Sequence, residues 1–173
     1  FVRSARTSLP ASVGTVSGKT APLHPMYAYC TESLDHVELD SRIEVPSESM
    51  LDTLGQYTAA VVVADRWYQH AQQTITYSLS FIPIEVIARL QIDLNDQQQL
   101  LEFLEHTSYD ESHHFYRSCT YSTSGNFTAK NYKLSSHDSF LLVFENIYDQ
   151  DHQLLMTNKH YIPCDLFKID LYI

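Results

Sequence analysis

The feature that most constrains the fold is an internal repeat, because residues 60–83 and 140–163 both read as an apolar strand, a polar turn and a second strand. When the first copy is shifted by 80 positions without a gap, similar residues meet at Val63 and Val143, Asp65 and Glu145, Tyr68 and Tyr148, Gln73 and Gln153, and Ile82-Pro83 and Ile162-Pro163. Two copies of a hairpin can pair into an antiparallel sheet with two halves. We therefore predict a single sheet in which the hairpins 59–82 and 139–162 are related by approximate internal symmetry.

Short helices and further strands are expected around these hairpins. Ser47 is a typical N-cap and Gly55 is typical of the position after a helix end, so we expect a short helix between them. Apolar and polar side chains alternate over 74–82, which predicts a strand with one buried and one polar face. Further helices are expected over 84–90, over 96–106 after an Asn95 cap and over 126–134, and further strands over 39–45, 114–123 and 166–171. Interspersed helices and tightly joined strand pairs give the α+β class, an antiparallel sheet flanked by short helices.

Length and composition indicate one domain. The chain has 173 residues, and residues 1–20 have the composition of a linker, so the domain is expected over 21–173. The net charge of −10 argues against nucleic-acid binding by this chain itself, because phosphates need a basic surface. Cys30, Cys119 and Cys164 suit reduced thiols in the cytoplasm better than a disulfide framework. No apolar run is long enough to span a membrane.

The motifs of catalysis and of metal binding are missing from the sequence. The nine histidines include no pair at the i, i+4 spacing that places two ligands on one helix face. There is no glycine-rich phosphate loop and no G-x-S-x-G nucleophile elbow. We therefore expect no metal, no cofactor and no catalytic residue.

Arg66 is the most informative charged residue, because it lies at the end of an otherwise apolar strand. A buried guanidinium needs a partner, which could be Asp65, Glu145 or a bound anion. Tyr68 lies two residues further on and shares the face of Arg66. From these residues alone, a structural salt bridge and a ligand role are equally good explanations of Arg66.

Three stretches resemble the effector-binding (UTRA) domain of GntR-superfamily transcription regulators of the HutC type, which shares its fold with chorismate lyase. These stretches are the opening Phe1-Val2-Arg3, the segment from Ala64-Asp65-Arg66-Trp67-Tyr68 through Phe81-Ile82-Pro83, and the segment from Leu141 to Ile169. In this order, they are similar to the segment that follows a winged helix-turn-helix, to the family's central hairpin and to its closing hairpin. The likeness covers nearly all of residues 22–171.

The resemblance implies a small-molecule pocket and a homodimer, with operator DNA bound only through a winged helix-turn-helix that would precede the linker 1–20. The positions that match the family's ligand-binding positions are Arg66, Tyr68, Ser78, Thr120, Ser122, Tyr161 and Thr31. Thr31 matches a loop that can meet an anionic ligand group, so the expected effector is a small anionic metabolite. Relatives that sense sugar phosphates often have arginine in place of Tyr68 and carboxylates in place of Ser78 and Leu155, so either the ligand differs or the pocket is degenerate.

The first interpretation is therefore the ligand-sensing, dimerising half of a bacterial transcription repressor, without enzyme activity. Two alternatives stay open. One is a lyase on the chorismate lyase fold, which would need two arginines around a dicarboxylate. The other is a non-catalytic interaction domain with an empty pocket.

The register of the first hairpin decides whether Ser78 can share a site with Arg66. If Tyr68 pairs directly with Gln73, Ser78 lies opposite Val63 and points to the other face. A three-residue loop over 70–72 with a bulge would instead place Ser78 opposite Ala64, on the face of Arg66. A site that contains Ser78 requires the second register.

Overall fold

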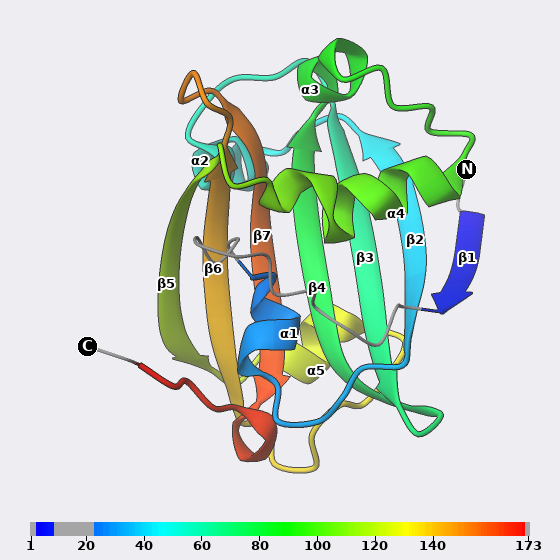
Figure 1. The fold of residues 1–173 in the computed structure, drawn as a ribbon, viewed down its shortest axis with the longest axis vertical. Coiled ribbons are helices and arrows are strands. Elements are labelled where there is room, and N and C mark those ends of the chain that lie inside the picture. Colours follow the sequence, from blue (N-terminus) through cyan, green and yellow to red (C-terminus); the bar gives the residue numbers. More distant parts are fainter. Residues whose placement is uncertain (1–2, 9–22, 172–173) are drawn as a thin grey trace.

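The computed structural model describes residues 3–8 and 23–171, which form one seven-stranded antiparallel sheet in the order β1-β2-β3-β4-β7-β6-β5 (Figure 1). The strands are β1 Arg3–Ser8, β2 His36–Glu44, β3 Val61–His70, β4 Gln73–Pro83, β5 His114–Ser122, β6 Phe140–Tyr148 and β7 Leu154–Pro163. The predicted α+β class and the antiparallel sheet are confirmed. Both predicted hairpins lie in this one sheet, and their inner strands β4 and β7 pair at its centre.

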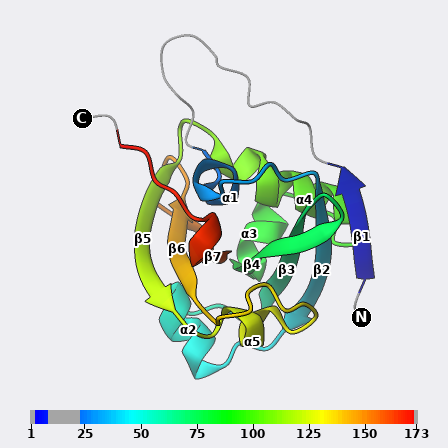
Figure 2. The same cartoon turned by 90° about the horizontal axis from the view of Figure 1, so that it is seen from below.

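Short helices cover both faces of the sheet (Figure 2). They are α1 Pro25–Tyr29, α2 Glu48–Leu54, α3 Ile84–Arg89, α4 Gln97–Glu105 and α5 Gly125–Ala129, with 3-10 turns η1 Thr107–Tyr109 and η2 Cys164–Leu166. Residues of α1, α3, α4 and η1 pack into the largest apolar cluster on one face, which we call the covered face. Helices α2 and α5 pack on the opposite face with two smaller clusters.

The internal repeat is visible in the pairing of β4 with β7. Leu79 pairs with Lys159, which is the residue that a shift of 80 assigns to it. Ser78 pairs with His160 and Ser80 with Asn158, so the pairing is unchanged when the two copies are exchanged. An approximate two-fold axis therefore passes between Leu79 and Lys159.

The gapless alignment of the two copies is wrong by one residue in the outer strands. Arg66 pairs with Ser78 in the first hairpin, whereas Glu145 pairs with Asn158 in the second. Since Ser78 and Asn158 are equivalent, Arg66 is equivalent to Glu145 rather than to Asn146. The reason is that two residues, 71–72, join β3 to β4, whereas residues 149–153 join β6 to β7.

The register of the first hairpin differs from both predicted alternatives. Ser78 lies directly opposite Arg66, because a two-residue turn and a bulge after Tyr68 set the pairing. Ser78 therefore lies on the same face as Arg66, as the second alternative required, but it pairs with Arg66 itself rather than with Ala64. The polar face that the alternation over 74–82 indicates is itself buried, because Thr76, Ser78 and Ser80 lie completely buried under the helices of the covered face.

Several local predictions can be compared with the structure. Ser47 caps α2 and Gly55 ends it with a φ of 68°, as predicted. Helix α4 is capped by Asp96 rather than Asn95, and α5 is shorter than expected. Residues 166–171 form no strand, because β5 holds that edge of the sheet and only Phe167 makes an isolated bridge, to Cys30.

The N-terminal part of the chain adds a strand to the sheet. Residues 3–8, which the sequence assigns to the linker, pair with β2 as the edge strand β1, so this part of the predicted linker belongs to the sheet. The remainder of the predicted linker, residues 1–2 and 9–20, lies outside the described residues. Within the described residues, none of the helices is long and apolar enough to cross a membrane.

Candidate functional site

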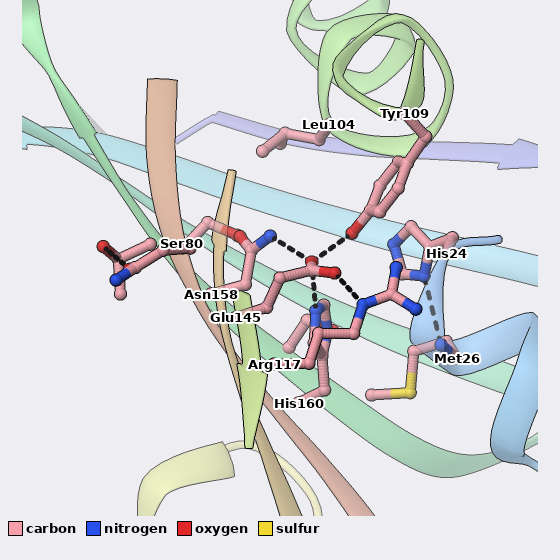
Figure 3. Close-up of polar contacts among 12 residues, drawn as sticks. His24, Met26, Ser80, Leu104, Tyr109, Arg117, Glu145, Asn158 and His160 are labelled. Carbon is pink, nitrogen blue, oxygen red and sulfur yellow. Dashed lines mark hydrogen bonds and ion pairs between the residues drawn. The ribbon is translucent and has the colours of Figure 1, made fainter. Parts of the chain in front are cut away.

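Polar side chains from the two halves of the sheet meet under α1, α4 and η1 on the covered face (Figure 3). Strands in the middle of a sheet that is covered on both faces are normally apolar, so these residues stand out. We call this group the buried polar cluster. Its members are His24, Tyr27, Arg66, Tyr68, Ser78, Ser80, Glu105, Tyr109, Arg117, Glu145, Asn158 and His160.

Arg66 is the centre of the half that β3 and β4 contribute. Its side chain is completely buried and its Nη1 lies 2.5 Å from Oε1 of Glu105, the last residue of α4. Nη1 also donates to the carbonyl oxygen of Leu104 at 3.2 Å, and Nη2 donates to Oγ of Ser80 at 2.8 Å. Nε of Arg66 has no hydrogen-bond partner among the described residues. The guanidinium is therefore neutralised by Glu105, while its Nε–H stays unused.

Glu105 connects three elements at this point. Its Oε1 accepts a hydrogen bond from Oη of Tyr68 at 2.6 Å, and its Oε2 accepts one from Oη of Tyr27 at 3.0 Å. His24 lies beside this group, with Nδ1 accepting from the backbone N–H of Met26 at 3.1 Å. A neutral His24 therefore carries its proton on Nε2, which is 3.4 Å from Oη of Tyr68.

Glu145 is the centre of the other half, at the position equivalent to Arg66. Its Oε1 accepts hydrogen bonds from Oη of Tyr109 at 2.6 Å, Nδ2 of Asn158 at 3.0 Å and Nε2 of His160 at 3.2 Å. Its Oε2 accepts a bond from Nε of Arg117 at 2.5 Å (Figure 3). Four donors thus surround one fully buried carboxylate.

A chain of hydrogen bonds joins the two halves across the pairing of β4 with β7. Arg66 donates to Oγ of Ser80, which donates to Oδ1 of Asn158 at 2.6 Å, and the amide of Asn158 donates to Glu145. Ser78 and Nδ1 of His160 form a second link, at 2.6 Å. The four residues of β4 and β7 in these links lie in two directly paired positions, so the register itself builds the connection.

The charges of the cluster are set by burial and by these partners. Burial, with the charges of His160 and Arg66, lowers the pKa of His24 well below its ordinary value. Burial also lowers the pKa of His160, although Glu145 opposes that shift. Burial alone would raise the pKa of Glu145, but its bonds with His160 and the charge of Arg117 hold that pKa below its ordinary value. The cluster therefore contains two ion pairs and two neutral histidines at neutral pH.

Comparison with solved structures relates this fold to ligand-binding domains of bacterial regulators. A GntR-family transcriptional regulator from Enterococcus faecalis V583 superposes with a TM-score of 0.59 at 14% identity, over 77% of this chain and 96% of that chain. The ligand-binding domain of a GntR-family regulator from Bordetella bronchiseptica gives a TM-score of 0.61 at 10% identity, over 84% and 96%. The effector-binding domain of the Bacillus subtilis trehalose repressor gives 0.54 at 14%, over 77% and 92%.

The chain has the fold of GntR-family effector-binding domains. No protein-family profile matches the sequence, and no curated protein sequence matches it either. The identities to the solved structures are low, so the similarity concerns the fold. Which residues of this effector-binding fold can hold a ligand has to be judged from the geometry of this chain.

The structure brings three of the seven expected ligand-binding residues together. Arg66, Tyr68 and Ser78 lie side by side in the buried polar cluster. Tyr161 is buried on the opposite face, where its ring stacks on Tyr77 with a centroid distance of 6.0 Å. Thr31 is exposed in the loop after α1.

Thr120 and Ser122 also lie away from the cluster. Both are on β5, where Arg117 points to the covered face. Side chains alternate between the two faces of a strand, and Thr120 and Ser122 are separated from Arg117 by odd numbers of residues. They therefore point to the opposite face. Ser122 pairs with Phe140, which belongs to the apolar cluster under α5. These two side chains therefore lie on the face opposite to the buried polar cluster.

Sequence reasoning missed the partners that complete the cluster. Asp65, one expected partner of Arg66, points to the opposite face and binds Arg42 at 2.6 Å. Glu145, the other, is paired with Arg117. Glu105 could have been found, because it follows Leu101 by one helical turn and therefore shares the apolar side of α4.

Two other kinds of site are conceivable for the cluster, a pair of arginines around a dicarboxylate and a metal site. Arg117 is a second arginine in the cluster, but its Nε, Nη1 and Nη2 donate to Glu145, to Oη of Tyr29 and to the carbonyl oxygen of Leu23. Within the buried polar cluster, Arg117 is therefore not free to join Arg66 around a dicarboxylate. Among the described residues, no group of three or more histidine, cysteine, aspartate or glutamate side chains is arranged to hold a metal ion.

Proposed function

We propose that this chain is the small-molecule-sensing domain of a bacterial transcription regulator, acting as a repressor in the cytoplasm and doing no chemistry itself. In this proposal the domain forms a homodimer, and operator DNA is bound by a winged helix-turn-helix that precedes the linker. The net charge of −10 fits that division, because the acidic domain has the wrong sign to bind phosphates by itself.

The observation that carries the proposal is the completely buried Arg66 inside this fold. A guanidinium in the middle of a covered sheet is expensive to bury unless it binds an anion. Its Nε and the hydroxyl of Thr76, which is buried on the neighbouring strand, both lack a partner among the described residues. These are groups with which a bound metabolite could form hydrogen bonds.

The proposed ligand is a small metabolite with a carboxylate or phosphate group. Such a group would take a charge-assisted bond from Arg66, with Tyr68 and Ser78 as neighbours. Binding would favour one of two arrangements of the dimer and so change the spacing of the attached DNA-binding domains.

The test is calorimetry with a panel of sugar phosphates and small carboxylates on the wild type and on Arg66→Ala. A ligand that binds the wild type should lose about 2–5 kcal/mol of binding free energy in the variant, as for a desolvated charge pair. Arg42→Ala is the matched control, because Arg42 is a partly exposed arginine on the neighbouring strand β2. Arg66→Lys, which keeps the charge but has no Nε–H fork, serves if the alanine variant does not fold.

Equal affinities of wild type and Arg66→Ala would show that Arg66 is only structural.

One observation favours a second candidate function, because Glu105 already neutralises Arg66 within the chain. A non-catalytic interaction domain without a ligand would have this property. It predicts that no compound of the panel binds the wild type and that only the assembly of the protein depends on this domain.

A further inference from the structure

We propose that Glu105 is an internal substitute for the anionic group of the ligand, and that a ligand carboxylate or phosphate displaces Glu105 from Arg66 and releases the end of helix α4. The inference rests on the proposed function, and it adds the regulation of the same site. It predicts that the form with Glu105 bound is the ligand-free form, in which Glu105 and the ligand compete for one guanidinium.

The first argument is that Glu105 uses Arg66 incompletely. Glu105 takes one bond from Nη1, while Nε of the same guanidinium stays without a partner among the described residues. An arginine can bind two oxygens of one carboxylate or phosphate side by side, through two of its nitrogens. An oxyanion that approaches from the Nε side would therefore satisfy a donor that Glu105 leaves unused.

The second argument is the place of Glu105 in its helix. It is the last residue of α4, where the helix dipole is negative and a carboxylate is unfavourable. The following residue, His106, has a φ of −128° and a ψ of −65°, and a short 3-10 turn comes after it. The carboxylate is thus held against the dipole by its partners, at a helix end that already departs from α-helical geometry.

The third argument is that Glu105 is the anchor of the end of α4. Its carboxylate binds β3 through Arg66 and Tyr68, and it binds α1 through Tyr27. Arg66 also donates to the carbonyl oxygen of Leu104, and the side chains of Leu100, Leu101 and Leu104 make apolar contacts. Apolar contacts have no fixed direction, so a helix that loses its polar anchor can shift on the sheet without leaving it.

The shift would reach the first strand of the chain. Helix α4 lies across the sheet, with Nε2 of Gln97 donating to Oγ of Ser41 in β2 at 3.2 Å near its start (Figure 1). The helix also contacts β1, the strand formed by Arg3–Ser8 (Figure 2). A ligand that removes Glu105 from Arg66 would therefore act on β1 through α4, toward the part of the regulator that the proposed function places before it.

The experiment measures the affinity of the 173-residue chain for inorganic phosphate and, in a second arm, for acetate, at constant ionic strength. The variants are Glu105→Gln, which removes the competing charge, and Glu102→Gln, which removes an exposed carboxylate one turn earlier in α4. We expect Glu105→Gln to bind at least one of the two anions about tenfold more tightly than the wild type, because a competitor within the chain is lost. Glu102→Gln should bind like the wild type.

The outcomes separate the two proposals. If all three proteins bind the anions with equal affinity, anion sensing survives and the competition is wrong. If none binds either anion, both the competition and the anion-sensing function fail. An equal gain in Glu102→Gln would mean that net charge alone raises the affinity, which also contradicts the competition.

A second measurement keeps the inference testable if Glu105→Gln does not fold. Hydrogen exchange of the wild-type chain is followed with and without phosphate. We expect faster exchange of the amides in residues 97–109 at high phosphate, with β6 and β7 unchanged. Unchanged or slower exchange in residues 97–109 would contradict the release of α4.

Discussion

Two buried ion pairs occupy equivalent places in the two halves of the sheet, and they are built differently. Glu145 receives four hydrogen bonds, from donors on β5, β7 and η1. Arg66 is neutralised by one carboxylate, and its Nε has no partner among the described residues. The same position of the repeat thus holds a saturated anion in one half and an incompletely used cation in the other.

This difference between the two ion pairs indicates different roles for Glu145 and Arg66. A saturated buried charge has nothing left to offer a ligand, so Glu145 fits a structural role. An unsaturated buried charge with a partner on a separate helix can exchange that partner. Under the proposed function, the ligand would therefore bind in the half that contains β3 and β4, and the half that contains β6 and β7 would be the structural support.

The largest expected effect is on stability, when the saturated carboxylate is removed. Glu145→Ala leaves Arg117, Asn158 and His160 with donors that have lost their acceptor. We expect the free energy of unfolding to fall by about 3–5 kcal/mol, as when one partner of a buried ion pair is deleted. Urea unfolding measures it, and Glu111→Ala, an exposed position, should stay within about 0.5 kcal/mol of the wild type.

The other ion pair gives the matched comparison. Replacing both partners, as Arg66→Met with Glu105→Leu, should restore part of the stability that either single change removes, because apolar residues of similar volume can replace a buried pair, although Tyr27 and Tyr68 lose their acceptor. The double change of Arg117 and Glu145 should recover less, since three further donors depend on Glu145. Equal recovery in both double variants would remove the distinction between the halves.

A smaller effect is expected from the two buried histidines, of which His24 lies in one half and His160 in the other. The pKa of each is lowered by burial, so the unfolded chain binds protons that the folded chain does not bind. The free energy of unfolding therefore rises with pH up to about 6.5. It falls as the pH drops below about 6.5, by up to roughly 1.4 kcal/mol per pH unit for each histidine. Below about pH 4.3 the lowered pKa of Glu145 adds a further loss in the same direction.

Urea unfolding between pH 5 and pH 7.5 measures this dependence, and titration of the histidine ring protons by NMR assigns it. His24 should stay neutral to lower pH than His160, because Glu145 opposes the shift of His160 through both a hydrogen bond and its charge, whereas it acts on His24 through its charge alone. His24→Asn and His160→Gln should each reduce the slope by about one proton. A stability that does not change over this range would mean that both histidines are charged in the folded protein.

The fold followed from local patterns, because hairpins and helix caps are specified by neighbouring residues. The strand alternation over 74–82 and the pair Ser47 and Gly55 predicted elements that the structure contains. The pairing register of the hairpins was harder to predict from the sequence. A bulge after Tyr68 and unequal turns moved the pairing by one to three positions relative to the predictions, and turn geometry depends on backbone angles that the residue types at 71–72 do not indicate.

The candidate site was predicted in part for a related reason. Arg66 and Tyr68 lie two residues apart on one strand, so strand geometry alone places them together. Glu105 and His24 come from distant segments, and their approach to Arg66 depends on how α1 and α4 pack on the sheet. Thr120, Ser122 and Tyr161 were expected from family positions, but which face a side chain takes follows from the exact register, which differs by one residue between the halves.

The smallest expected effect concerns the turns that cause this difference between the halves. In the first hairpin Ala71 and Gln72 have φ values of 48° and 67°, which suit a two-residue turn but are unfavourable for these residues. In the second hairpin the carboxylate of Asp149 accepts bonds at 2.9 Å from the backbone N–H groups of Asp151 and Gln153, so the longer turn has its own support. Strain is therefore expected at both residues of the first turn, whereas the second turn has one such residue, His152 with a φ of 60°, together with side-chain support from Asp149.

Replacing the first turn by Asn-Gly, as Ala71→Asn with Gln72→Gly, should raise the free energy of unfolding by about 0.5–1 kcal/mol, because these residues adopt positive φ at lower cost. Both side chains are exposed, so the replacement removes no packing. Asp149→Ala should act in the opposite direction, since it removes the acceptor that holds the second turn. Urea unfolding compares the three proteins, and an Asn-Gly variant that is less stable than the wild type would show that Ala71 and Gln72 are not strained.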